Sequence, residues 1–270
     1  MTIYKSHLPS IQVPEESLYS HLFGTRFLDF PPSRPAYIDA NTGRTISRGD
    51  VRELTLSFGH GLKHAFRSRG GVQLSRGDVV LILSPNSIAW PIMLFGAMSA
   101  GLRVTLANSS YVARELEHQW TDSRAKAVIV APPLVPVVLE MFKNVGLSET
   151  AAKQRIILAD WGFPRNVFPS EYTTMASLLG LGKLVQEEAF RGKQTEETVL
   201  LCYSSGTTGK PKGVETTHRN MVHLINMVQT VFHVVDGDVM LGILPFYHIY
   251  GESSSLALFT RALISRRVLQ

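Results

Sequence analysis

The residues best suited to chemistry lie in one short segment, 204–213, which reads SSGTTGKPKG. Its two flexible glycines can take positive φ, so that successive backbone N–H groups turn toward one point and form an anion-binding nest. Four hydroxyl groups add further donors, and a lysine supplies a mobile positive charge that suits phosphate oxygens. The segment therefore predicts a polyphosphate site made by Ser204, Ser205, Gly206, Thr207, Thr208, Gly209 and Lys212.

The loop lies between two predicted strands. Residues 199–203 form a short apolar run, and residues 214–217 alternate like a second strand. The ordinary alternative is a Ser/Gly-rich surface turn, which the density of matching features disfavours. The P-loop of common NTPases is also excluded, because it needs Gly-Lys followed by Ser or Thr, whereas Lys210 precedes proline and Lys212 precedes glycine.

The whole string YSSGTTGKPKG, residues 203–213, resembles the signature loop of the acyl-adenylate-forming enzymes, the AMP-dependent synthetases and ligases. It looks closest to the acyl-CoA and 4-coumarate–CoA ligase branch. The resemblance implies that residues 204–208 and Lys212 hold the β- and γ-phosphates of ATP. It implies no metal-ligating side chain.

A second string, LPFYHIYG at residues 244–251, resembles the aromatic-histidine motif of the same family. By that resemblance His248 is catalytic and lies beside the carboxylate of the acid, while His248, Tyr250 and Ser254 line the acyl pocket. Taken alone, a histidine among aromatic residues is more often a hydrogen-bonded core residue. The pairing of the two motifs favours the functional interpretation.

The implied reaction joins a small carboxylic acid to coenzyme A at the expense of ATP, with Mg²⁺, through an acyl-adenylate. Aromatic, fatty and polyketide-derived acids all remain open. Two alternatives also stay open: a non-catalytic relic or interaction protein that retains a phosphate-binding loop, and a fragment of a peptide-synthetase adenylation module.

The elements that must position these residues alternate between strand and helix. Residues 79–83 form an unbroken apolar run, typical of a parallel strand covered on both faces. Residues 85–87 suggest a turn and helix cap, and 122–123 a helix stop. The predicted strands are 79–83, 104–106, 127–130, 155–158, 199–203 and 239–244, and the predicted helices are 17–23, 51–66, 88–100, 113–120, 135–144, 173–179 and one beginning at 218.

This alternation, with the resemblance, predicts an α/β fold: the partial N-terminal domain of an acyl-adenylate-forming enzyme, with mostly parallel sheets layered with helices. The expected organisation is an irregular segment 1–34, a partial AMP-binding domain 35–259 and a divergent tail 260–270. The family's adenine and ribose contacts and its small C-terminal domain have no counterpart in the sequence. We therefore expect weak or no turnover by this chain alone.

The amino-acid composition limits which other classes of protein the chain can belong to. The mean hydropathy of +0.07 and 44% hydrophobic residues are typical of a globular chain. The net charge of +5 comes from scattered residues, so no nucleic-acid partner is predicted. A single cysteine, Cys202, allows no internal disulfide and suggests a small buried hydrophobe rather than a nucleophile. Residues 88–100 are too short to span a membrane.

The location predicted from these features is intracellular, either cytoplasmic or peroxisomal. The first residues lack the long apolar segment of a secretory signal. The last three residues, VLQ, do not form a peroxisomal tripeptide.

Overall fold

The apolar run Val79–Leu83 forms strand β3, which is buried along its whole length. In this computed structural model, residues 10–24, 31–161, 171–204, 209–231, 238–253 and 263–266 are described, the last range by its backbone alone. Strand β3 pairs in parallel with β4 (Arg103–Ala107) and with β5 (Ala127–Val130). The prediction of a parallel sheet at this point is confirmed.

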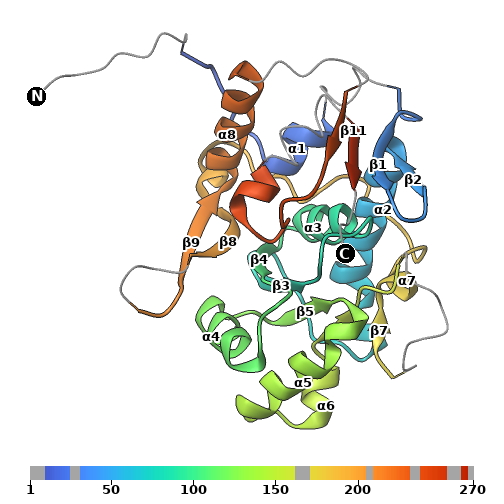
Figure 1. Cartoon of the computed structure of the whole chain (residues 1–270), viewed down its shortest axis with the longest axis vertical. Coiled ribbons are helices and arrows are strands. Elements are labelled where there is room, and N and C mark those ends of the chain that lie inside the picture. The colour runs from blue at the N-terminus through green and yellow to red at the C-terminus, as the bar shows by residue number, and fades with distance from the viewer. Residues whose placement is uncertain are drawn as a thin grey trace, which may run out of the picture.

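Strand β3 lies in the middle of a seven-stranded sheet with the order β7-β6-β5-β3-β4-β8-β9 (Figure 1). Every neighbouring pair in this order is parallel except β8 and β9, which form an antiparallel hairpin. The outer strands are β6 (Ile156–Leu158), β7 (Thr173–Thr174), β8 (Thr198–Ser204) and β9 (Lys212–Thr217).

Helices cover both faces of this sheet, which explains why β3 is apolar throughout. Its Val80 and Ile82 pack in one core with residues of α2 (Arg48–His60) and α3 (Trp90–Ser99). The alternate residues, including Leu81, pack in a second core with α4 (Ala113–Ser123) and α5 (Val135–Asn144). The alternation of a β-strand thus assigns successive side chains to two separate cores.

A second sheet has the order β10-β11-β1-β2. The hairpin of β1 (Pro35–Asp39) and β2 (Thr45–Ser47) ends at Ser47, whose side chain caps α2. Strand β11 (Leu263–Arg266), within the segment expected to be a tail, pairs in parallel with both β1 and β10 (Val239–Leu241). The other helical elements are α1 (Leu18–Phe23), Gly61–Ala65, Arg67–Arg69, Pro132–Leu134, α6 (Glu149–Lys153), α7 (Met175–Leu178), Gly192–Glu196 and α8 (His218–Val231).

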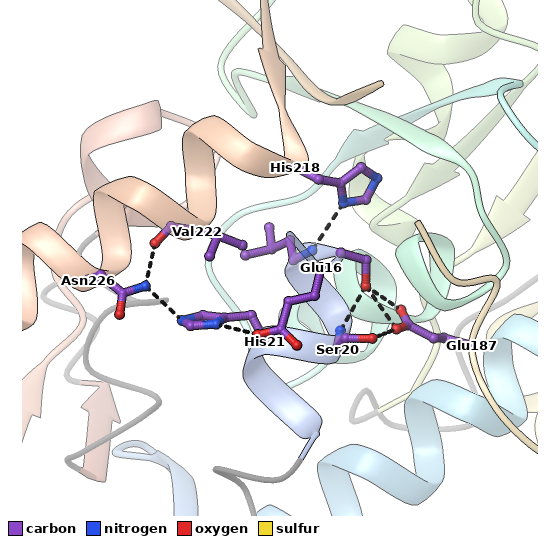
Figure 2. Close-up of polar contacts among 9 residues, drawn as sticks. Glu16, Ser20, His21, Glu187, His218, Val222 and Asn226 are labelled. Carbon is purple, nitrogen blue, oxygen red and sulfur yellow. Dashed lines mark hydrogen bonds and ion pairs between the residues drawn. The ribbon is translucent and has the colours of Figure 1, made fainter. Parts of the chain in front are cut away.

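A buried polar network attaches α1 to α8 and to the segment before β8 (Figure 2). The Glu187 carboxylate accepts hydrogen bonds from Ser17, at 2.8 and 2.9 Å, and from Ser20. The Nδ1 of His218 accepts the Leu18 N–H at 3.1 Å. Burial raises the pKa of Glu187 to about 7 and lowers that of His218 to about 4.

The same network continues along α8. The Asn226 amide lies 3.1 Å from Nε2 of His21, and Nδ1 of that buried histidine lies 2.9 Å from Glu16 (Figure 2). Helix α1 is therefore fixed to α8 at both of its ends, and α8 begins where the hairpin strand β9 stops.

Several predicted boundaries are wrong, each for a local reason. Helix α4 continues through the predicted stop at 122–123 and ends at Ser123, and its C-cap residue Arg124 takes the left-handed conformation with φ 54°. Helix α3 begins at Trp90 without a side-chain cap, because the Asn86 side chain bonds to a distant segment instead. Strand β10 ends at Leu241, and residues 173–179 divide between β7 and α7.

Candidate functional site

A cleft of about 520 Å³ opens at the carboxyl ends of β4 and β8. Parallel α/β sheets commonly bind their ligands at this edge. The cleft brings together Ser204 and His248, which the sequence assigns to two different motifs. Its walls are formed by Leu106, Asn108, Tyr111, Glu115, Cys202, Tyr203, Ser204, Pro211, Val214, Thr216, Tyr247, His248 and Ile249.

The hairpin of β8 and β9 carries the predicted phosphate lysine on a strand that lines this cleft, although Lys212 itself is not among the lining residues. Ser204 is paired with Lys212, and Cys202 with Val214. Residues paired across antiparallel strands share a face, as do residues two apart along one strand. Since Val214 and Thr216 line the cleft, Lys212 lies on the cleft side of β9, where it is exposed.

The loop that joins these strands is described only at its ends. Gly209 has a φ of 156°, a conformation that residues with side chains rarely adopt, and it is exposed. The predicted phosphate ligands Ser205, Gly206, Thr207 and Thr208 lie outside the described residues.

His248 presents one ring nitrogen for binding. The Nδ1 atom of its ring accepts the backbone N–H of Tyr250 at 3.3 Å, and the backbone N–H of His248 donates to the Pro245 carbonyl at 3.1 Å. A neutral imidazole that accepts at Nδ1 carries its proton on Nε2. The exposed ring therefore has an N–H donor that can bind an anionic group, such as a carboxylate, in the cleft.

The two other residues predicted for the acyl pocket are not brought to this cleft by the described structure. Tyr250 is 64% exposed and is not among the lining residues, whereas its neighbours Tyr247 and Ile249 are. Ser254 lies outside the described residues. Their assignment to the acyl pocket stays a prediction.

The sequence motifs did not indicate several residues that shape the site. Asn108 and Tyr111 follow β4, and their position after a parallel strand is the signal that could have found them. Tyr203 lines this cleft and a neighbouring cleft of about 610 Å³ beside α4. Burial, with the Asp122 carboxylate that its hydroxyl contacts at 2.5 Å, raises the pKa of Tyr203.

A histidine on α4 holds the far end of the phosphate loop. The Nε2 of His118 donates to the Pro211 carbonyl at 2.7 Å, and the ring meets Tyr203 edge-on at 6.0 Å. This contact joins residues 93 positions apart, so no local pattern in the sequence indicates it.

Two buried acidic groups lie close to the site. Burial raises the pKa of the Cys202 thiol to about 12, which agrees with its interpretation as a small buried hydrophobe. Burial also raises the pKa of Glu252 to about 8, although the Trp90 indole donates to its carboxylate at 3.1 Å.

Two features are absent from the described ranges. No group of three or more His, Cys, Asp or Glu side chains in them could hold a metal ion. No helix in them has the length and apolar character needed to cross a membrane.

Comparisons with known proteins agree on one family. The family model described as AMP-binding enzyme matches residues 25–262. The chain is 31% identical to 4-coumarate–CoA ligase-like 3 of Oryza sativa subsp. japonica, over 97% of this chain and 44% of the relative. It is 30% identical to a long-chain-fatty-acid–CoA ligase of Yersinia pestis, over 84% of this chain and 42% of the relative.

Solved structures show the same fold. A long-chain-fatty-acid-CoA ligase from Archaeoglobus fulgidus superimposes with a TM-score of 0.80 at 21% identity, over 99% of this chain and 50% of that one. A red-emitting luciferase from Phrixothrix hirtus gives 0.77 at 22% identity, over 97% and 48%. The chain thus spans less than half the length of the curated relatives named above. Since the family model covers most of its residues, the chain belongs to the family of AMP-binding enzymes.

Proposed function

We propose that this chain provides the triphosphate-binding loop and the acid-contacting histidine of an acid–CoA ligase. The observation that carries the proposal is the convergence of Ser204 and His248 on one cleft, with Lys212 on the same side of the hairpin. Relatives named as 4-coumarate–CoA ligases and as a fatty-acid–CoA ligase support this reaction class.

In the proposed reaction, the carboxylate of a small acid attacks the α-phosphorus of ATP, and the bond to pyrophosphate breaks. The coenzyme A thiolate then attacks the acyl carbon, and AMP leaves. The Nε2–H of His248 would orient the carboxylate, while Lys212 and the loop N–H groups would stabilise the charge that accumulates on the departing pyrophosphate. Mg²⁺ would enter with the nucleotide, whose phosphates bind it.

We also propose that these 270 residues alone convert little or no acid to its CoA ester. The proposed location of the protein is intracellular. A titration with ATP and Mg²⁺ tests the binding part. We expect saturable binding that Lys212→Met weakens about 10-fold or more, since a charge-assisted hydrogen bond contributes about 1.5–3 kcal/mol. Lys193→Met is the matched control, because Lys193 is also exposed but lies in the short helix before β8. Equal affinity of both variants would contradict the proposed site.

An assay for acid-dependent formation of AMP by the purified chain tests the proposed lack of turnover. ATP binding without AMP formation from 4-coumarate or a fatty acid is the expected result, and it would also agree with a non-catalytic phosphate-binding protein. Measurable turnover would contradict the expectation of an incomplete site and would show that the ligase reaction needs no further residues.

A further inference from the structure

The side chain of Asn86, in the turn after β3, forms three hydrogen bonds to one distant stretch of backbone. Its Nδ2 donates to the carbonyls of Gly242, at 3.1 Å, and Leu244, at 2.8 Å. Its Oδ1 accepts the N–H of Phe246 at 2.7 Å. Both the nitrogen and the oxygen of this carboxamide therefore hydrogen-bond to the segment that leads directly into His248.

Trp90, at the start of α3, holds the same segment from its other side. The indole N–H donates to Glu252, which is fully buried, and the ring lies 6.1 Å from that of Phe246. The Glu252 N–H in turn donates to the His248 carbonyl at 2.9 Å. Asn86 and Trp90 thus contact the chain on both sides of His248: Asn86 bonds to residues 242–246, and Trp90 bonds to Glu252.

We infer that Asn86, with Trp90, is a positioning residue that sets the place of His248 in the cleft. Neither Asn86 nor Trp90 is among the residues that line the cleft, so both act through the backbone of the histidine segment. This inference rests on the proposed function in one respect, since it takes His248 to be the residue that meets the acid. It assigns a role in substrate placement to a turn that the sequence pattern marks only as a helix cap.

An asparagine is required by the geometry of the contact. Two carbonyl oxygens need a donor, and one N–H needs an acceptor, on the same short side chain. Aspartate keeps the acceptor for the Phe246 N–H but turns an oxygen toward the two carbonyls. Alanine removes all three bonds, so that the Gly242 and Leu244 carbonyls and the Phe246 N–H lose their side-chain partner.

Hydrogen exchange in the ligand-free chain tests the positioning directly. In Asn86→Ala we expect the backbone amides of Phe246 and His248 to exchange at least 10-fold faster, with Asn86→Asp intermediate. Amides of β3 and β4, such as that of Val104, should keep their native rates. Asn144→Asp, at the exposed end of α5, makes the same change of charge without these contacts and should match the native chain.

A binding comparison then separates positioning from general structure. Asn86→Ala should bind pyrophosphate with native affinity, because the phosphate loop belongs to β8 and β9, but should bind 4-coumarate, in the presence of ATP, at least 10-fold more weakly. Trp90→Phe removes the indole donor and part of the ring volume, and it should show the same difference between the two ligands in milder form. It carries the test if Asn86→Ala fails to fold. Trp120→Phe, in the core on the other face of the sheet, is its control.

Two results would overturn the inference. One is native exchange at Phe246 and His248 in both Asn86 variants and in Trp90→Phe. The other is equal acceleration of exchange in the β3–β4 amides, which would reduce the contact to a general stabilising role. If the native chain binds no acid, the proposed function fails, and the exchange rates alone then decide whether Asn86 positions His248.

Discussion

At the scale of single residues, the site depends on which atoms remain able to bind a ligand. In His248, which lines the cleft, the Nδ1 atom accepts the Tyr250 N–H, so that Nε2–H is the ring donor left for a ligand. A donor without positive charge can orient a carboxylate without holding it as a tight ion pair. That arrangement suits a group that must remain nucleophilic.

We predict that His248→Ala weakens acid binding while nucleotide binding is retained. Loss of one hydrogen bond to a charged group corresponds to about 1.5–3 kcal/mol, or roughly 10–100-fold in affinity. Calorimetric titrations with 4-coumarate and with ATP check this. His223→Ala, on α8 and outside the cleft lining, should change neither affinity. An unchanged acid affinity in His248→Ala would remove His248 from the site.

Glu252 makes stability depend on pH in an unusual direction. Its folded pKa of about 8 lies above the ordinary value of 4.5, so the folded chain binds this proton more tightly than the unfolded chain. The associated stability is fully present below about pH 4.5 and is lost as the pH rises to 8.

Glu252→Gln should therefore be more stable than the native chain at pH 9, by about 1–3 kcal/mol, because it removes a buried charge and keeps an acceptor for Trp90. Urea unfolding at pH 6 and pH 9 measures the change. Glu187 titrates in a neighbouring range, but it is present in both proteins, so their difference isolates Glu252. Glu140→Gln on the exposed side of α5 should show no such pH dependence, and the same flat result for Glu252→Gln would contradict the argument.

At the scale of elements, the phosphate loop depends on a helix that does not belong to its hairpin. Helix α4 fixes the end of the loop through the bond from His118 to the Pro211 carbonyl. A loop that is held before the ligand arrives loses less conformational entropy when it binds.

His118→Ala should weaken pyrophosphate binding by about 3–10-fold, the equivalent of one neutral hydrogen bond of about 0.5–1.5 kcal/mol. His118→Gln retains a donor and should restore part of the affinity. His64→Ala, at an exposed helix end, serves as the control for loss of a histidine. If His118→Ala binds pyrophosphate as the native chain does, α4 has no part in organising the loop.

The contacts that fix α1 lead to a second prediction at the scale of elements, which concerns the free energy of unfolding. Ser17 caps α1 and also donates to Glu187, whereas Ser148 only caps the exposed start of α6. Ser17→Ala should reduce the free energy of unfolding by about 1–3 kcal/mol, more than Ser148→Ala at about 0.5–1 kcal/mol. Thermal or urea unfolding of both variants compares them. Equal losses would mean that the bond to Glu187 adds nothing.

At the scale of the whole molecule, the periodic parts of the fold could be predicted and the long-range polar contacts could not. Apolar runs such as 79–83 indicate buried strands because both faces of the sheet are covered. The two motifs around residues 204 and 248 indicate a shared site, and Ser204 and His248 both line one cleft, although their roles stay a prediction.

The sequence could not indicate that a single polar side chain hydrogen-bonds to residues far away along the chain. Asn86 looks like the start of a helix but bonds to residues 156–160 positions away. Asp122 looks like a helix stop, but α4 continues past it and its carboxylate accepts the Tyr203 hydroxyl. Local pattern carries no signal for such contacts, because they depend on which strands become neighbours.

The central claim is that the loop following β8 binds the phosphates of a nucleotide. The most direct test is an amide ¹⁵N titration of the full 270-residue chain with ATP and Mg²⁺. We predict saturable shifts concentrated at 204–213, with a weaker response at His248, and about 10-fold weaker binding in Lys212→Met. Shifts that fall elsewhere, or amides at 204–213 that do not respond at saturating ATP, would contradict the account.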